Sequence, residues 1–201
     1  LALKADGTVW AWGGNANGQV GDGSNSDRNV PVQVSSLSGV VAVAAGALHS
    51  LAVKSNGTVW AWGHGGYGEL GNGSALDRNV PVQVSGLSGV TAVAAGSYHS
   101  LARKADGTGW AWGWNGSGQL GDDTLNPSNV PVQVLGLTNI TTVAAGHEHS
   151  LALGSDGTVW AWGANNRGQL GDGTTMPSAV PVEVAGLPTA SAISAGNWHS
   201  M

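Results

Sequence analysis

The chain has 201 residues, a formal net charge of −5 and only 9% charged residues, with 34 Gly, 10 Trp and no Phe. This glycine content and scarcity of charge predict a turn-rich β fold and exclude a helical bundle. The 7 Lys and Arg residues are scattered, so we expect neither nucleic acid nor membrane insertion among its interactions.

Internal repetition organises the whole sequence. A shift of 50 residues aligns the chain with itself without a gap and superimposes Trp10, Trp60, Trp110 and Trp160. Each copy holds four short apolar segments separated by Gly, Pro, Asn and Asp, which is the pattern of a four-stranded propeller blade. We therefore predict an all-β propeller, or a propeller segment, over 1–201, with repeats at 1–50, 51–100, 101–150 and 151–200.

The second blade shows the predicted elements in chain order. Strand A covers 40–45, strand B 51–54, strand C 58–62 and strand D 80–84. Asn56-Gly57 between B and C supplies the positive φ angles of a tight hairpin. Pro81 cannot donate a backbone hydrogen bond, so D should be the outer edge of the blade.

Strand C carries the predicted core. Side chains alternate along a strand, so Trp60 and Trp62 share one face while Val59 and Ala61 share the other. Blades stacked with indoles against small residues would interdigitate, and two indoles in each blade should dominate the buried area. We expect these tryptophans to be core residues rather than ligand platforms.

The repeated motifs resemble a known family. They are Ala-Ala-Gly-x-x-His-Ser-Leu-Ala, as in 144–152, and Asp-Gly-Thr-Val-Trp-Ala-Trp-Gly, as in 156–163. Together with Gly-Gln-Leu-Gly-Asp-Gly they resemble the regulator of chromosome condensation repeat, along nearly the whole chain. The resemblance implies a propeller with diverse binding roles, which include nucleotide exchange, chromatin binding, light sensing and β-lactamase inhibition.

Chain direction places the A–B and C–D connections at the same end of every blade. Both connections vary among copies whose framework is nearly constant, and Tyr, Trp and Arg are common anchors of protein interfaces. The candidate partner-binding residues on this rim are Leu48, His64, Tyr67, Tyr98, Trp114, His147, Glu148, Arg167 and Trp198.

Other site chemistry has weaker support in the sequence. The histidine that ends each A–B loop, such as His49, is better explained as a hydrogen-bond partner than as a metal ligand. His147 and His149 could chelate zinc, but no third ligand is evident. The sequence contains no nucleophile–base pair, so we expect no enzyme activity, no metal and no cofactor.

The leading hypothesis is therefore a non-enzymatic scaffold that binds a protein partner, and the alternative is a lectin-like module that stacks sugars on the same indoles. The chain opens at a strand B, 1–4, and stops soon after a strand A, 192–195, so a split blade could be completed between chains. A longer parent propeller is the other explanation that we favour. The near-identical Gly- and Ala-rich copies favour a bacterial secreted or surface protein.

Overall fold

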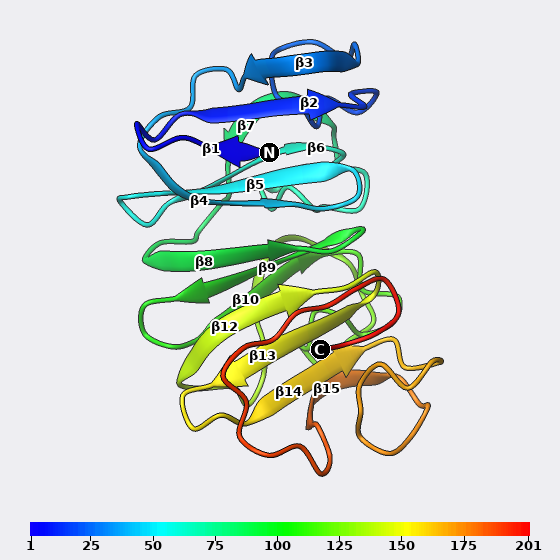
Figure 1. Ribbon diagram of the computed structural model, residues 1–201. Coiled ribbons are helices and arrows are strands. Elements are labelled where there is room, and N and C mark those ends of the chain that lie inside the picture. Colours follow the sequence, from blue (N-terminus) through cyan, green and yellow to red (C-terminus); the bar gives the residue numbers. More distant parts are fainter.

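A computed structural model describes residues 1–201 as fifteen β-strands and no helix. The strands form four antiparallel sheets, which succeed one another along the molecule as the blades of a propeller (Figure 1). The predicted all-β propeller fold is confirmed. The structure contains no helix that is long and apolar enough to cross a membrane.

The first blade has three strands, and each of the other blades has four, in the order A, B, C, D. The strands of the first two blades are β1 (Ala2–Leu3), β2 (Val9–Gly13), β3 (Arg28–Gln33), β4 (Val40–Ala45), β5 (His49–Lys54), β6 (Val59–Gly63) and β7 (Arg78–Gln83). Those of the other two are β8 (Val90–Ala95), β9 (His99–Lys104), β10 (Gly109–Gly113), β11 (Ser128–Gln133), β12 (Ile140–Ala145), β13 (His149–Gly154), β14 (Val159–Gly163) and β15 (Ser178–Glu183).

The B–C turns and the edge position of the D strands agree with the sequence-based prediction. Gly57 has φ 76° and donates its amide hydrogen to the carbonyl of Lys54, which closes the B–C hairpin. The predicted bounds of strand A, 40–45, are those of β4, whereas β5 and β7 each begin two residues before the predicted strand. The proline-containing D strands form the outer edge of every sheet, as predicted.

The core lies between blades rather than within one. Val59 and Ala61 on one face of the second blade pack in a cluster with Trp112 of the third blade, and Trp110 packs against the same cluster. The inner indoles Trp62, Trp112 and Trp162 are buried, while their outer partners Trp60, Trp110 and Trp160 are half-buried. The expected packing of indoles against small residues is confirmed at each of the three blade contacts.

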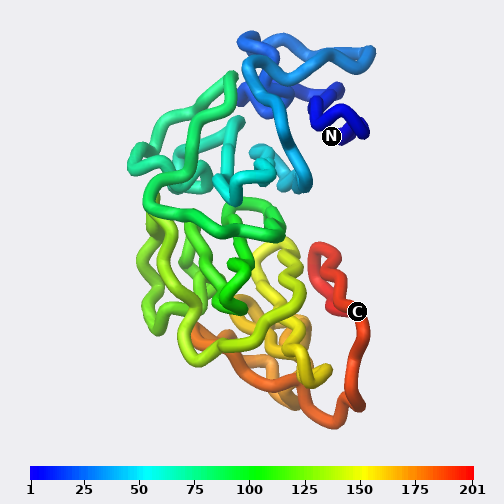
Figure 2. The backbone as a smooth tube through the Cα atoms, turned by 90° about the vertical axis from the view of Figure 1, so that its left-hand side faces the viewer, coloured from blue at the N-terminus to red at the C-terminus, as the bar shows by residue number.

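Two parts of the first and last blades depart from the prediction. Trp12 was expected in the core but is 50% exposed, because no blade packs against its face. The segment 192–195, expected as a strand A, forms only the isolated bridge between Ala195 and Ser200. β1 pairs with β2 alone, and the blades form an open arc in which the termini lie apart (Figure 2).

Candidate partner-binding rim

The A–B and C–D connections meet at one end of the blades and bring six aromatic rings together. Trp114 and Tyr67 have ring centroids 4.9 Å apart, and Tyr67 lies 5.4 Å from Tyr98 in an edge-on arrangement. His64 contacts both tyrosines, at 5.7 and 6.4 Å. These separations and tilts are those that aromatic pairs prefer.

The row of rings continues into the fourth blade and beyond it. Tyr98 lies 6.4 Å from His147, and His147 stacks on Trp198 with centroids 4.6 Å apart and an interplanar angle of 28°. We call the six residues His64, Tyr67, Tyr98, Trp114, His147 and Trp198 the aromatic arc. Tyr67 and Trp198 are its most open members, at 44% and 42% exposed, so the arc presents aromatic surface to solvent.

The three other predicted site residues differ in their relation to the arc. Glu148 lies beside it: Glu148 accepts a 3.0 Å hydrogen bond from the Ser117 hydroxyl, and one of its oxygens is 3.6 Å from the His147 ring. Arg167 is exposed and lines a cavity together with Trp198. Leu48 contributes its carbonyl oxygen, which accepts the amide hydrogen of His64. Eight of the nine predicted residues therefore have side chains in the arc or beside it. Leu48 is connected to the arc only through its backbone carbonyl, which bonds to His64.

A buried asparagine holds the C–D loop that carries Trp114, whereas Gly65 occupies the same position in the loop that carries His64 and Tyr67. The fully buried Asn115 accepts a hydrogen bond from the amide of Leu120 at 2.9 Å. Its side-chain amide donates to Asp122 and to the carbonyl of Thr124. Asn15 and Asn165 make the equivalent bonds in their repeats. Because Asn115 directly follows Trp114, this network fixes the backbone beneath the indole.

Sequence reasoning missed Glu69, which lies beneath the arc in the second repeat. The other copies have Gln19, Gln119 and Gln169 at this position, and each side-chain oxygen accepts a backbone amide hydrogen two residues upstream. Glu69 does the same through Oε2, while its Oε1 lies 2.7 Å from Nδ1 of His64. Burial raises the pKa of Glu69, although the hydrogen bond from His64 opposes this. The sequence did offer a signal for this contact, because the repeat with Glu at this position is also the one repeat with His at position 64.

The A–B loop histidines are structural, as predicted, but their partners lie on the next blade. His49, His99 and His149 place Nε2 at 2.9 to 3.1 Å from Ser100, Ser150 and Ser200. Because Ser100 donates its hydroxyl hydrogen to the carbonyl of Glu69, it accepts from Nε2 of His49. Burial lowers the pKa of His49 and His99 to about 3, so both rings are neutral at pH 7.

No group of three or more His, Cys, Asp or Glu side chains could hold a metal ion. In the His-x-His segment the two rings have separate neighbours: His147 stacks on Trp198, and His149 bonds to Ser200. The chemistry of the rim is therefore aromatic contact combined with peripheral carboxylates and hydrogen-bonding groups.

Comparison with known proteins identifies the framework that carries this rim. The family model described as the RCC1-like domain matches residues 1–201. The chain belongs to the RCC1-like family. Human WBSCR16 aligns with 98% of this RCC1-like chain at a TM-score of 0.89 and 28% identity. Yeast RCC1 (Prp20), in a complex with Kap60, aligns with 99% of it at a TM-score of 0.85 and 27% identity.

The RCC1-like chain spans about half the length of these solved relatives, 53% and 50% respectively. Two curated relatives from Arabidopsis thaliana match a shorter segment. The RCC1 domain-containing protein RUG3 and the ultraviolet-B receptor UVR8 are each 43% identical over 54 residues, which is 26% of this chain and 12% of theirs. The resemblance to the regulator of chromosome condensation repeat is thereby confirmed.

Proposed function

We propose that this chain is a non-enzymatic scaffold that binds a protein partner through the aromatic arc. The observation that carries the proposal is the continuity of the six rings across three successive A–B loops and two C–D loops. The equivalent positions in other copies hold Gly14, Leu48 and Ala164, so the blade framework does not require aromatic residues there. Rigid, amphipathic Tyr and Trp side chains provide contact area at low entropic cost.

The half-exposed state of the arc supports a binding role. Its rings restrain one another, so their rotamers are largely set before a partner arrives, which reduces the entropy lost on binding. Glu148 and Arg167 at its margin offer charges of both signs for orienting a partner. The yeast relative was solved with Kap60 bound, which is consistent with a protein partner for this framework.

Selection of peptides from a random displayed library on the immobilised chain tests the proposal. We expect enriched peptides to lose at least tenfold in affinity when Tyr67, Trp114 and Trp198 are replaced by alanine, since such anchors each contribute about 2 kcal/mol or more. The matched control replaces Leu76, Leu125 and Met176, which are exposed apolar side chains of the C–D connections outside the arc. The control variant should bind as the unmodified chain does.

Equal losses in both triple variants, or no loss in either, would contradict the proposal. A glycan ligand is the alternative for the same surface, because indole faces stack on sugars. Binding to a glycan array that disappears in the Tyr67, Trp114 and Trp198 variant, without any enriched peptide, would favour that alternative.

A further inference from the structure

Three of the four repeats place an ammonium group over an indole, at the end of the blades opposite the aromatic arc. In each of them the lysine at the end of strand B has its nitrogen 5.4 to 5.7 Å from the ring centroid of the outer tryptophan of strand C, which is within cation–π range. The pairs are Lys4 with Trp10, Lys54 with Trp60 and Lys104 with Trp110. In the first and third repeats the same nitrogen also lies 3.2 Å from a carboxylate oxygen of Asp6 or Asp106.

The fourth repeat keeps the indole and the carboxylate but has no lysine. Trp160 and Asp156 occupy their usual positions, while Gly154 stands where the other repeats have lysine. In the other repeats the nitrogen of the outer indole donates to a threonine hydroxyl two residues upstream, whereas Trp160 makes no such bond. The Asp156 carboxylate leans toward the glycine, since a Cβ built on Gly154 would lie 2.6 Å from Oδ1 of Asp156. Both groups that hold the ammonium elsewhere are therefore present without the chain's own cation.

A pocket of about 270 Å³ opens over this indole, and we call it the Trp160 pocket. It is lined by Trp160, Gly154, Ser155, Asp156 and the connection 136–139. The amide of Ser155 donates to the carbonyl of Asn139 at 3.0 Å, which holds the two walls together. In the third repeat the lysine fills the equivalent space: a Cβ at Gly89, the equivalent of Asn139, would lie 4.0 Å from Cε of Lys104. The pocket is therefore shaped by the same elements that enclose a lysine side chain elsewhere in the chain.

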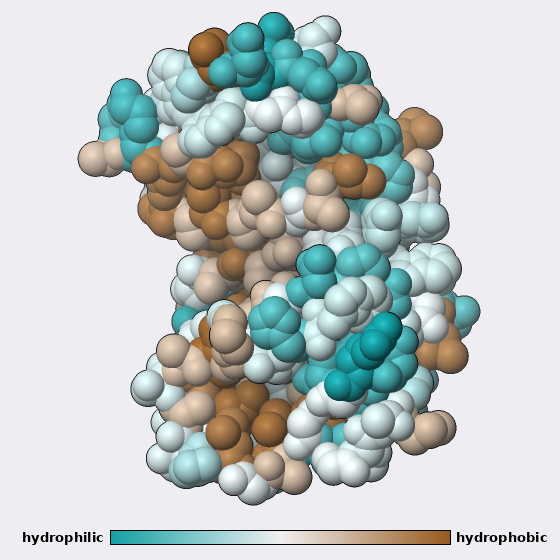
Figure 3. Space-filling model, turned by 45° about the vertical axis from the view of Figure 1, so that its right-hand side comes forward, coloured by the Kyte–Doolittle hydropathy of each residue, from teal (hydrophilic) through white to brown (hydrophobic).

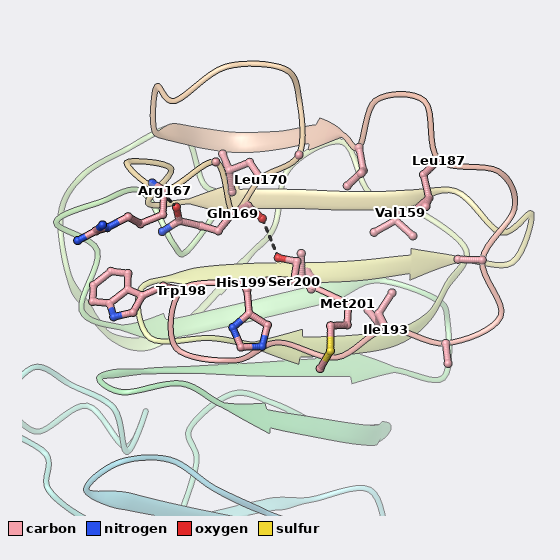
Figure 4. Close-up of a pocket in the computed structure, with 16 residues that line it drawn as sticks. Val159, Arg167, Gln169, Leu170, Leu187, Ile193, Trp198, His199, Ser200 and Met201 are labelled. Carbon is pink, nitrogen blue, oxygen red and sulfur yellow. Dashed lines mark hydrogen bonds between the residues drawn. The ribbon is translucent and has the colours of Figure 1, made fainter.

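The Trp160 pocket lies between the third and fourth blades. Side chains alternate along a strand, so Trp160 and Val159 of β14 face opposite ways. Val159 and Leu170 line a different, apolar cavity on the other face of the fourth blade (Figure 4). Hydrophobic side chains gather in a hollow beside this C-terminal blade (Figure 3). Trp160 instead packs against the cluster that includes Leu101 and Ala111 of the third blade. The walls of the Trp160 pocket therefore come from two blades that are packed together.

We propose that the Trp160 pocket binds an alkylammonium group, with its nitrogen between the indole of Trp160 and the carboxylate of Asp156. The ligand is a primary amine on a flexible apolar stem, which is the chemistry that Lys4 and Lys104 supply in their own repeats. Hydrogen bonds from Thr158 hold the pKa of Asp156 below its ordinary value of 3.8, so the carboxylate carries its charge at pH 7. The ammonium belongs either to a lysine of another polypeptide or to a small free amine.

Titration with butylammonium chloride at constant ionic strength tests the proposal, because this ion is a lysine side chain without its backbone. The indole N–H signals of the chain are followed by NMR, and the signal of Trp160 is the one that disappears in Trp160→Phe. Exposed cation–π contacts and surface ion pairs are individually weak, so we expect saturable binding in the millimolar range. The Trp160 signal should shift. Those of Trp10, Trp60 and Trp110 should not, because their own lysines already occupy the site.

Three variants locate the bound ion. Gly154→Lys supplies the chain's own ammonium at a position where the other repeats have lysine, and it should abolish the shift. Gly154→Ala is the matched control: its Cβ approaches only the movable carboxylate of Asp156 and the carbonyl of Thr158, so the pocket stays open and binding should persist. Asp156→Asn keeps the turn chemistry of Asn56 in the second repeat, removes the charge, and should weaken binding several-fold.

Two further probes define the ligand. Nα-acetyl-lysine methylamide carries the same ammonium on a peptide backbone: an equal shift of the Trp160 signal would assign the pocket to a lysine of another polypeptide, and a shift with butylammonium alone would assign it to a small amine. The uncharged 1-butanol should cause no shift.

The proposal is overturned if butylammonium leaves the Trp160 signal unmoved, if 1-butanol shifts it equally, or if Gly154→Lys binds as the unmodified chain does. Equal shifts of the Trp10, Trp60 and Trp110 signals would also contradict it. None of the substituted residues belongs to the aromatic arc. Amine binding and peptide binding can therefore fail separately.

Discussion

The indole nitrogen of Trp112 lies 2.7 Å from the carbonyl oxygen of Glu69, which belongs to the preceding blade. The hydroxyl of Ser100 donates to the same oxygen at 2.9 Å and accepts a hydrogen bond from Nε2 of His49. A buried carbonyl with two donors and a buried indole with its hydrogen bond satisfied are both stable arrangements in a dry interface. Neighbouring blades are thus joined by directional bonds as well as by apolar packing.

The close approach of Trp112 to Gly71 predicts a position-specific cost for an added methyl group. Gly71→Ala puts a Cβ 2.8 Å from the indole nitrogen, at a φ of +60°. We expect a loss of about 2 to 5 kcal/mol in the free energy of unfolding, from backbone strain of about 1–2 kcal/mol and overpacking of about 1–3 kcal/mol. Urea denaturation of the variant measures the loss.

Gly73→Ala is the control for that substitution. Gly73 has a φ of +81°, but a Cβ there would meet nothing within 4 Å, so only the backbone cost applies. Equal losses in the two variants would contradict the role given to the glycine beneath the indole.

The buried histidines predict that stability falls in mild acid. Their pKa is about 3 in the folded chain for His49 and His99, against 6.5 for an exposed ring. Between these values the unfolded chain binds protons that the folded chain does not, so stability is retained above pH 6.5 and is lost as the pH falls toward 3. Each histidine should contribute a slope of about 1.4 kcal/mol per pH unit.

Denaturation midpoints measured between pH 7.5 and pH 5 test this dependence. His99→Asn should destabilise the chain at pH 7.5, because the bond to Ser150 is lost, and should also reduce the pH slope. An unchanged slope in this variant would show that other groups cause the acid sensitivity.

The network around Asn115 predicts that the loop carrying Trp114 depends on one buried amide. Asn115→Ala leaves the buried amide hydrogen of Leu120 without its acceptor, which should cost about 3 kcal/mol. Asn166→Ala, at an exposed loop position, should change stability by less than about 0.5 kcal/mol. Thermal unfolding of both variants gives the comparison, and similar values for the two would count against the network.

The burial of Glu69 predicts a stability difference that changes with pH. Because the pKa of Glu69 is raised on folding, its stabilising contribution is present below the ordinary value of 4.5 and is lost as the pH rises through the folded value. Glu69→Gln keeps the acceptor for the amide of Tyr67 and removes this loss. Relative to the unmodified chain, the variant should gain stability between pH 4 and pH 8, as measured by urea denaturation; a constant difference would contradict the account.

Much of the fold follows from local rules that the sequence displays. Pro81 predicts an edge strand because it lacks an amide hydrogen, and the alternation of Trp62 with Ala61 predicts which face meets the next blade. The bonds between His49 and Ser100 could not be predicted, because they connect residues 51 apart whose proximity depends on the rotation between blades. Burial of a single tryptophan could not be predicted from the motif either. Trp12 occupies the same motif position as Trp62 but is exposed, because no blade covers it.

The candidate rim was predictable as a set of loops but not as an ordered row. Chain direction places Tyr67 and Tyr98 at the same end, whereas their edge-on contact depends on how far neighbouring blades are rotated. Glu69 was overlooked because it occupies a position that the framework already explains by glutamine. What distinguishes it from glutamine is the 2.7 Å contact between its Oε1 and Nδ1 of His64, which only the structure shows.

Hydrogen exchange of the chain with and without a selected peptide tests the central claim most directly, because it maps the contact without any substitution. Binding at the aromatic arc should slow amide exchange in the loops around Tyr67, Tyr98 and Trp114 and leave the B–C turns, such as 55–57, unchanged. Protection confined to the B–C and D–A connections at the opposite end of the blades would contradict the account.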